Sequence, residues 1–132
     1  DPLETIPSYF SLQENVKFGN LLTSDEMKLL RKETYAEIIE WYKETEKVKS
    51  KLFKKQFITL TYPQITSDLE NSISLFYKFI GKKMTKKFQK QVSDYAGKKY
   101  TKKHQNKTIE DYGFTKKQIL SDFDFVYQKY FV

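Results

Sequence analysis

The stretch Phe57-Ile58-Thr59-Leu60-Thr61-Tyr62, followed by Pro63, bears most directly on the fold class. Aromatic and β-branched side chains fill this short run, which is typical of a β-strand, and the proline marks its end. The sequence offers no second run of this kind. Because one strand cannot form a sheet, we expect partner strands outside this chain, and the run predicts an α/β fold.

Helical patterns occupy the sequence on both sides of this run. Amphipathic spacing predicts helices at about 3–17, 23–50, 67–80, 85–96 and 115–131. Three of these helices are expected to begin at capping boxes, namely Thr23 with Glu26, Ser67 with Glu70, and Thr115 with Gln118. The sequence therefore predicts a mostly helical chain with about one strand.

The composition of the 132 residues limits the possible functions. Lys and Arg number 24 against 17 Asp and Glu, which gives a formal charge of +7, and Arg31 is the one arginine. This excess fits either an anionic partner or a solvated lysine-rich surface. The absence of cysteine excludes disulfides and thiolate metal sites and favours a reducing compartment such as the cytoplasm. No uncharged run is long enough to span a bilayer.

The densest group of polar donors lies in residues 98–108, which we expect to form a basic loop. This loop holds His104, the one histidine. Metal binding by His104 is not expected because no second histidine or cysteine accompanies it. Nothing local orients His104 toward a serine for nucleophilic catalysis. The glycines stand alone, so no phosphate loop of the G-x-x-x-x-G-K type is present in the sequence.

Two segments near the ends of the chain together suggest a family. The first is Lys103-His104-Gln105-Asn106-Lys107-Thr108-Ile109-Glu110-Asp111-Tyr112-Gly113-Phe114, and the second is Asp1-Pro2-Leu3-Glu4-Thr5-Ile6-Pro7-Ser8. They resemble the C-terminal K-H…S-x-E-D-[FY]-G signature and the R-D-P…S segment of sulfotransferases that use 3′-phosphoadenosine 5′-phosphosulfate (PAPS). Residues 61–68 partly resemble the R-Y-E-D-L-x-x-D-P segment of that family, with Pro63 and Gln64 in place of its acids.

The resemblance implies a P-loop-like α/β fold, with residues 1–132 as the C-terminal part of a single domain. It also implies transfer of a sulfuryl group from PAPS to a hydroxyl or amine of an acceptor that the sequence does not identify. The residues matching the nucleotide-binding motifs are Ser8, Tyr62, Lys103, His104 and Lys107. The resemblance implies that Ser8 and the 103–107 loop bind the 3′-phosphate of the nucleotide, and that Tyr62 stacks against its base.

The resemblance assigns no catalytic residue to this sequence. In the family, the phosphate loop and the base that activates the acceptor precede the segment that matches Asp1. Since the chain opens with Asp1 rather than methionine, we expect a longer parent protein and no PAPS turnover by these 132 residues alone. No metal and no nucleic acid are expected as partners.

Other interpretations remain open beside the sulfotransferase one. A basic helical module that binds nucleic acid or a protein without catalysis fits the same composition. A divergent family member retained as a scaffold also fits the departures at Pro63 and Gln64.

Overall fold

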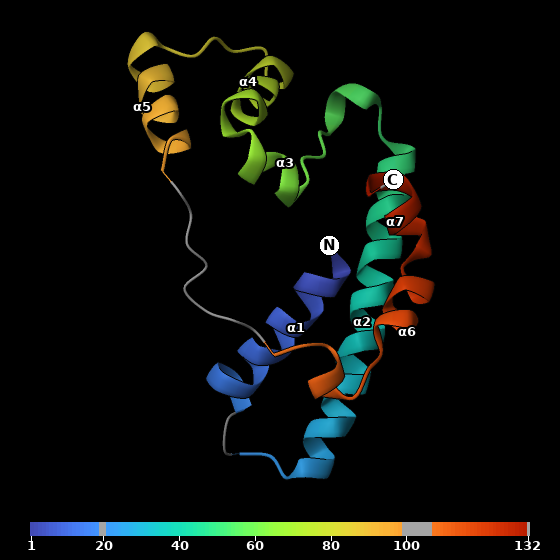
Figure 1. Ribbon diagram of the computed structural model, residues 1–132. Coiled ribbons are helices and arrows are strands. Elements are labelled where there is room, and N and C mark those ends of the chain that lie inside the picture. The colour runs from blue at the N-terminus through green and yellow to red at the C-terminus, as the bar shows by residue number, and fades with distance from the viewer. Residues whose placement is uncertain (19–20, 99–106, 132) are drawn as a thin grey trace. The chain divides into compact units, whose positions relative to one another are not determined.

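The computed structural model describes residues 1–18, 21–98 and 107–131, and most of them are helical (Figure 1). Gln13–Phe18 extends the first helix as a π-helix, and Lys54–Gln56 and Glu110–Tyr112 form 3-10 turns. The α-helices are α1 (Pro2–Leu12), α2 (Ser24–Lys51), α3 (Tyr62–Ser67), α4 (Leu69–Phe79), α5 (Lys86–Ala96), α6 (Lys116–Asp122) and α7 (Asp124–Tyr130).

The expected strand at 57–62 does not form. Residues 57–61 carry no regular structure, although the backbone is extended at Phe57 (φ −148°, ψ 153°) and at Thr61 (φ −79°, ψ 151°). Thr61 and Gln64 instead make a capping box that begins α3, and Pro63 lies in its first turn, where a missing N–H is harmless. The prediction of an α/β, P-loop-like fold is therefore wrong for the described residues, which contain no strand to pair with this segment.

The chain divides into two compact units. The first unit comprises residues Asp1–Val48 and His104–Val132, and the second comprises Lys49–Lys103. The first unit thus joins the two ends of the sequence, while the second is one continuous segment.

Large rings build the core of the first unit. Phe10 of α1 and Phe123 are fully buried, and the Tyr35 ring of α2 lies 4.6 Å from that of Phe114 and 6.2 Å from that of Phe123. Figure 1 shows α6 and α7 running along α2. The buried cluster comprises Ile6, Phe10, Tyr35, Ile38, Ile109, Tyr112, Phe114, Ile119, Phe123 and Val126.

Local capping fixes most helix starts. The backbone N–H and hydroxyl of Thr23 donate to the Glu26 carboxylate at 2.8 and 2.7 Å, as the sequence predicts. Thr85 and Thr115 likewise accept hydrogen bonds from the third residue of their helices. The predicted start at Ser67 is wrong by one residue, because Asp68 caps α4 through the backbone N–H of Asn71 at 3.0 Å.

The final helical pattern is interrupted at one position. Phe123 has φ −109° and ψ 20°, so α6 ends and α7 begins there rather than forming one helix over 115–131. Its ring is fully buried and meets the Tyr42 ring edge-on at 5.2 Å. The break divides the buried stripe between two short helices that both pack in the core.

In the second unit, α4 and α5 form a helical hairpin. Gly81 has φ 66°, its N–H donates to the carbonyl of Lys78, and the N–H of Lys82 donates to that of Tyr77. These are the two hydrogen bonds of a Schellman motif, for which glycine supplies the left-handed residue. The Tyr77 and Phe88 rings then pack across the hairpin at 5.5 Å.

Candidate functional site

The residues predicted to bind the nucleotide are divided between the two units. Ser8 is exposed on α1 and Lys107 is exposed in the first unit, whereas Tyr62 is 63% exposed at the start of α3 in the second. Tyr62 is therefore the first residue of a helix and not the end of a strand. Lys103 and His104 lie outside the described residues.

The two segments that carry the family resemblance lie in the first unit, where Ile6 of the first and Ile109, Tyr112 and Phe114 of the second belong to one buried cluster. The Phe10 ring of α1 lies 5.2 Å from the Tyr112 ring and 5.6 Å from the Phe114 ring. The Tyr127 hydroxyl donates a hydrogen bond to the Asp1 carboxylate at 2.6 Å. Buried rings and a hydrogen bond thus hold residues 1–10 against residues 112–127, which follow about a hundred residues later in the sequence.

The Thr108–Phe114 segment owes its shape to its own residues. The Asp111 carboxylate accepts hydrogen bonds from the backbone N–H and hydroxyl of Thr108 at 2.7 and 2.9 Å, and these bonds lower the pKa of Asp111. Gly113 has φ 84°, which a side chain would strain. This turn directs Tyr112 and Phe114 into the core, so a large part of the motif has a structural role.

An ionic cluster lies where the π-helix that follows α1 meets α2 and Lys107, the residue before this segment. Glu14 pairs with Arg31 and with Lys107, whose Nζ lies 3.4 Å from its Oε2. The Arg31 and Lys107 side chains also lie 5.3 and 5.8 Å from the centre of the Tyr112 ring. Two cations share one carboxylate, so this cluster carries a formal excess of one positive charge.

Several polar atoms in and near this cluster lack a partner among the described residues. They are Nε of Arg31, the hydroxyl oxygen of Tyr112, and Oε1 of Gln13, whose Nε2 donates to Thr34 at 2.9 Å. An open, largely polar hollow of about 490 Å³ borders the cluster. Its lining residues are Glu14, Asn15, Leu22, Thr23, Ser24, Met27 and Arg31.

The sequence predicts a binding role for Lys107 but gives no such indication for Glu14 or Arg31. Both lie in helices where charged residues are common, and their separation of 17 positions gives no periodic signal. The one available clue was that Arg31 is the sole arginine, a residue favoured for partly buried ion pairs.

Charge is distributed unequally between the two units. Residues 49–103 contain fourteen lysines and three acidic residues, a formal charge of +11. The remaining 77 positions contain ten Lys and Arg and fourteen acidic residues, a formal charge of −4. The overall excess of positive charge therefore belongs to the second unit.

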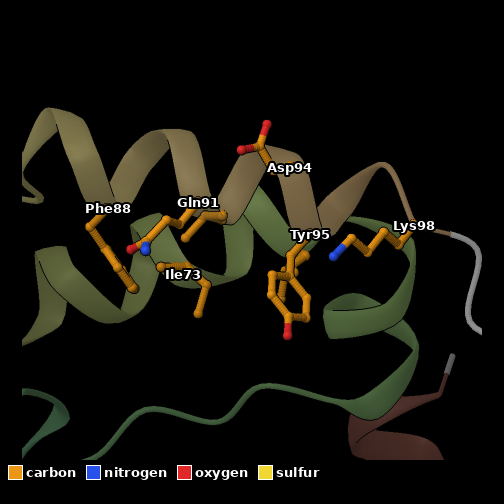
Figure 2. A pocket seen from close by; sticks show the side chains of 8 residues that line it. Ile73, Phe88, Gln91, Asp94, Tyr95 and Lys98 are labelled. Atoms are coloured by element: carbon orange, nitrogen blue, oxygen red, sulfur yellow. The ribbon is translucent and has the colours of Figure 1, made fainter.

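The second unit also has an apolar groove between α4 and α5, with a volume of about 520 Å³. Figure 2 shows Ile73 and Phe88 toward one end and Tyr95 beside Lys98 at the other. The ammonium group of Lys98 lies 4.5 Å from the centre of the Tyr95 ring. The lining residues are Leu69, Ile73, Phe88, Gln91, Val92, Asp94, Tyr95 and Lys98.

Two further features concern metal binding and membrane insertion in the part of the chain that the structure describes. It contains no group of three or more His, Asp or Glu side chains arranged to hold a metal ion. None of its helices combines the length and apolar character needed to cross a membrane.

Comparisons with protein-family models, with curated proteins and with solved structures give no match to this chain. The sulfotransferase resemblance therefore rests on the motifs of the sequence alone.

Proposed function

We propose that this chain serves PAPS-dependent sulfuryl transfer by binding the 3′-phosphate end of the nucleotide in its first unit. The observation that carries the proposal is the meeting of the two motif segments. Ile6 of the first segment shares one buried cluster with Ile109, Tyr112 and Phe114 of the second, although about a hundred residues separate the segments in the sequence. A shared phosphate site requires this proximity.

The electrostatics of the first unit support an anion site at Lys107. The unit is acidic as a whole, yet Arg31 and Lys107 together outnumber the one carboxylate that they share. An incoming phosphate would form charge-assisted hydrogen bonds with Lys107 and relieve its competition with Arg31 for Glu14. The exposed hydroxyl of Ser8 has no hydrogen-bond partner among the described residues and is free to donate.

The proposal assigns different roles to neighbouring motif residues. Lys107 and Ser8, with Lys103 and His104 from the sequence, would contact the nucleotide. Tyr112 and Phe114 would hold the segment in place through the core. The proposal assigns no catalytic residue, and the acceptor hydroxyl or amine stays unspecified. A basic helical module without catalysis remains the competing prediction.

Calorimetric titration with adenosine 3′,5′-bisphosphate, the product that remains after sulfuryl transfer, tests the proposal. We expect binding by the intact chain and an upward shift of its melting temperature. Adenosine 5′-phosphate, which lacks the 3′-phosphate, should bind at least roughly tenfold more weakly, because a charge-assisted hydrogen bond contributes about 1.5–3 kcal/mol.

Single substitutions test which residues form the 3′-phosphate site. Ser8→Ala and Lys107→Ala should each lower the affinity for the bisphosphate, whereas Lys116→Ala removes an exposed lysine of the same unit and should not. Because Lys107→Ala also removes the contact with Glu14, the affinity is the deciding measurement and not the melting temperature of the free variant. Absence of binding, or equal binding of both nucleotides, would disprove the proposal.

A further inference from the structure

The tip of the α4–α5 hairpin combines positive charge with exposed apolar side chains. We define the hairpin tip as residues 76–87, which include the end of α4, the Gly81 turn and the start of α5. Five lysines lie in it, and Lys90 follows one turn later. These six are Lys78, Lys82, Lys83, Lys86, Lys87 and Lys90, and all are exposed.

No acidic residue occurs between Glu70 and Asp94, so these lysines have no carboxylate close to them in the sequence. None of the six side chains forms a hydrogen bond or ion pair with another described residue. In the first unit, by contrast, Lys28, Lys43 and Lys129 each pair with a carboxylate. The positive charge of the tip is therefore uncompensated within the unit, which favours an external anionic partner.

Apolar side chains are exposed among these lysines. Phe76 and Ile80 lie one helical turn apart at the end of α4, with 41% and 43% of their surfaces exposed. Leu75, beside them in the sequence, is 41% exposed. A partner that matches the tip must supply negative charge and also remove these side chains from water.

We propose that the hairpin tip docks on the surface of a membrane that contains anionic lipids. Lipid headgroups would neutralise the lysines, and the acyl boundary would receive Phe76 and Ile80. A nucleic acid satisfies the charge but offers no apolar phase for aliphatic side chains such as Ile80 and Leu75. The chain lies on the membrane in this arrangement and does not cross it.

The geometry of the turn suits such docking. The Schellman hydrogen bonds at Gly81 and the packing of Tyr77 on Phe88 fix the hairpin before it meets a membrane. Little conformational entropy is then lost on docking. Binding should consequently occur without a large gain in helix content.

Co-sedimentation of the full chain with vesicles tests this inference. We expect binding to vesicles of equal parts phosphatidylcholine and phosphatidylserine, weakening as salt is added, and little binding to phosphatidylcholine alone. The double variant Lys82→Gln/Lys83→Gln should lower the partition coefficient by roughly thirtyfold, since each lysine near an anionic surface contributes about fivefold. Ile80→Ser should lower it by roughly tenfold.

The matched control is Lys116→Gln/Lys117→Gln, which removes the same charge from exposed positions of the first unit. Retained binding by this control supports the assignment to the tip, and an equal loss overturns it. Equal binding to neutral and anionic vesicles overturns it as well, as does binding to a single-stranded oligonucleotide without binding to vesicles. Circular dichroism establishes that each variant is folded. Nucleotide binding by the first unit is measured separately, so either proposal can fail alone.

Discussion

The Tyr127 hydroxyl donates a hydrogen bond of 2.6 Å to the Asp1 carboxylate and accepts one of 3.2 Å from the backbone N–H of Leu3. It thereby ties α7 to the first turn of α1 across more than a hundred residues of sequence. The same Asp1 carboxylate caps α1 through the N–H of Leu3 at 3.0 Å. One side chain of the closing helix thus completes the capping of the first helix.

We expect Tyr127→Phe to lower the free energy of unfolding of the first unit by about 1–2 kcal/mol, because it removes the hydroxyl from both hydrogen bonds. Urea denaturation monitored by circular dichroism measures the change. Tyr9→Phe is the matched control, since the Tyr9 hydroxyl forms no hydrogen bond with the described residues and its ring is retained. Equal losses in the two variants would contradict the role of the Tyr127 hydroxyl.

A second tyrosine, Tyr35, should make the free energy of unfolding depend on pH in the alkaline range. The buried Tyr35 hydroxyl donates to Asp122 at 2.7 Å, and burial, followed by this carboxylate, raises the pKa of Tyr35 above its ordinary value of 10.0. A raised pKa means that the unfolded chain loses this proton first. The resulting stability is fully present below about pH 10 and is lost as the pH rises through the folded pKa.

The measurement is the difference in unfolding free energy between the native chain and Tyr35→Phe as a function of pH. We expect a constant difference from pH 7 to about 10 and a decrease above it. Phenylalanine retains the ring contacts with Phe114 and Phe123, so the comparison isolates the hydroxyl. A difference that stays constant well above pH 10 would rule out this linkage.

Loss of Arg31 should be costlier than loss of an exposed lysine. Arg31→Ala leaves Glu14, whose side chain is only 16% exposed, with Lys107 as its remaining cation and removes the contact with the Tyr112 ring. We expect a loss of about 2 kcal/mol in urea denaturation. Lys28→Ala, which breaks the exposed pair with Asp25, should cost less than about 0.5 kcal/mol.

The core of the first unit should be sensitive to truncation at Phe123. Its side chain is fully buried and meets the rings of Tyr35 and Tyr42, so Phe123→Ala should cost about 3–5 kcal/mol. Phe53→Ala, at a ring that is 73% exposed, should change stability by less than about 0.5 kcal/mol. Comparable effects of the two substitutions in urea denaturation would contradict the burial of Phe123.

The two units should differ in amide hydrogen exchange. Of the buried apolar side chains in the described residues, Val92 is the one that belongs to the second unit. We therefore expect the amides of α4 and α5 to exchange faster than those of α1, α6 and the first half of α2. Mass spectrometry of peptic fragments measures this, and equal protection of the two sets would refute it.

Local physics explains which predictions from the sequence were confirmed. The helices beginning near Thr23, Thr85 and Thr115 depend on a side-chain oxygen meeting an N–H three residues away, and these contacts form in the structure. The stop at Gly81 needs only the conformational freedom of glycine. Such interactions span a few residues, so the sequence specifies them without knowledge of the rest of the fold.

The structural features that need a partner distant in the sequence were decided by the tertiary structure. Residues 57–61 remain unpaired because a strand exists only beside another strand, and in the described residues helix capping at Thr61 prevails instead. Burial of Phe123 divides a helix that periodicity alone predicts as continuous. The Glu14–Arg31–Lys107 cluster likewise arises from folding, because only packing brings its three charges together.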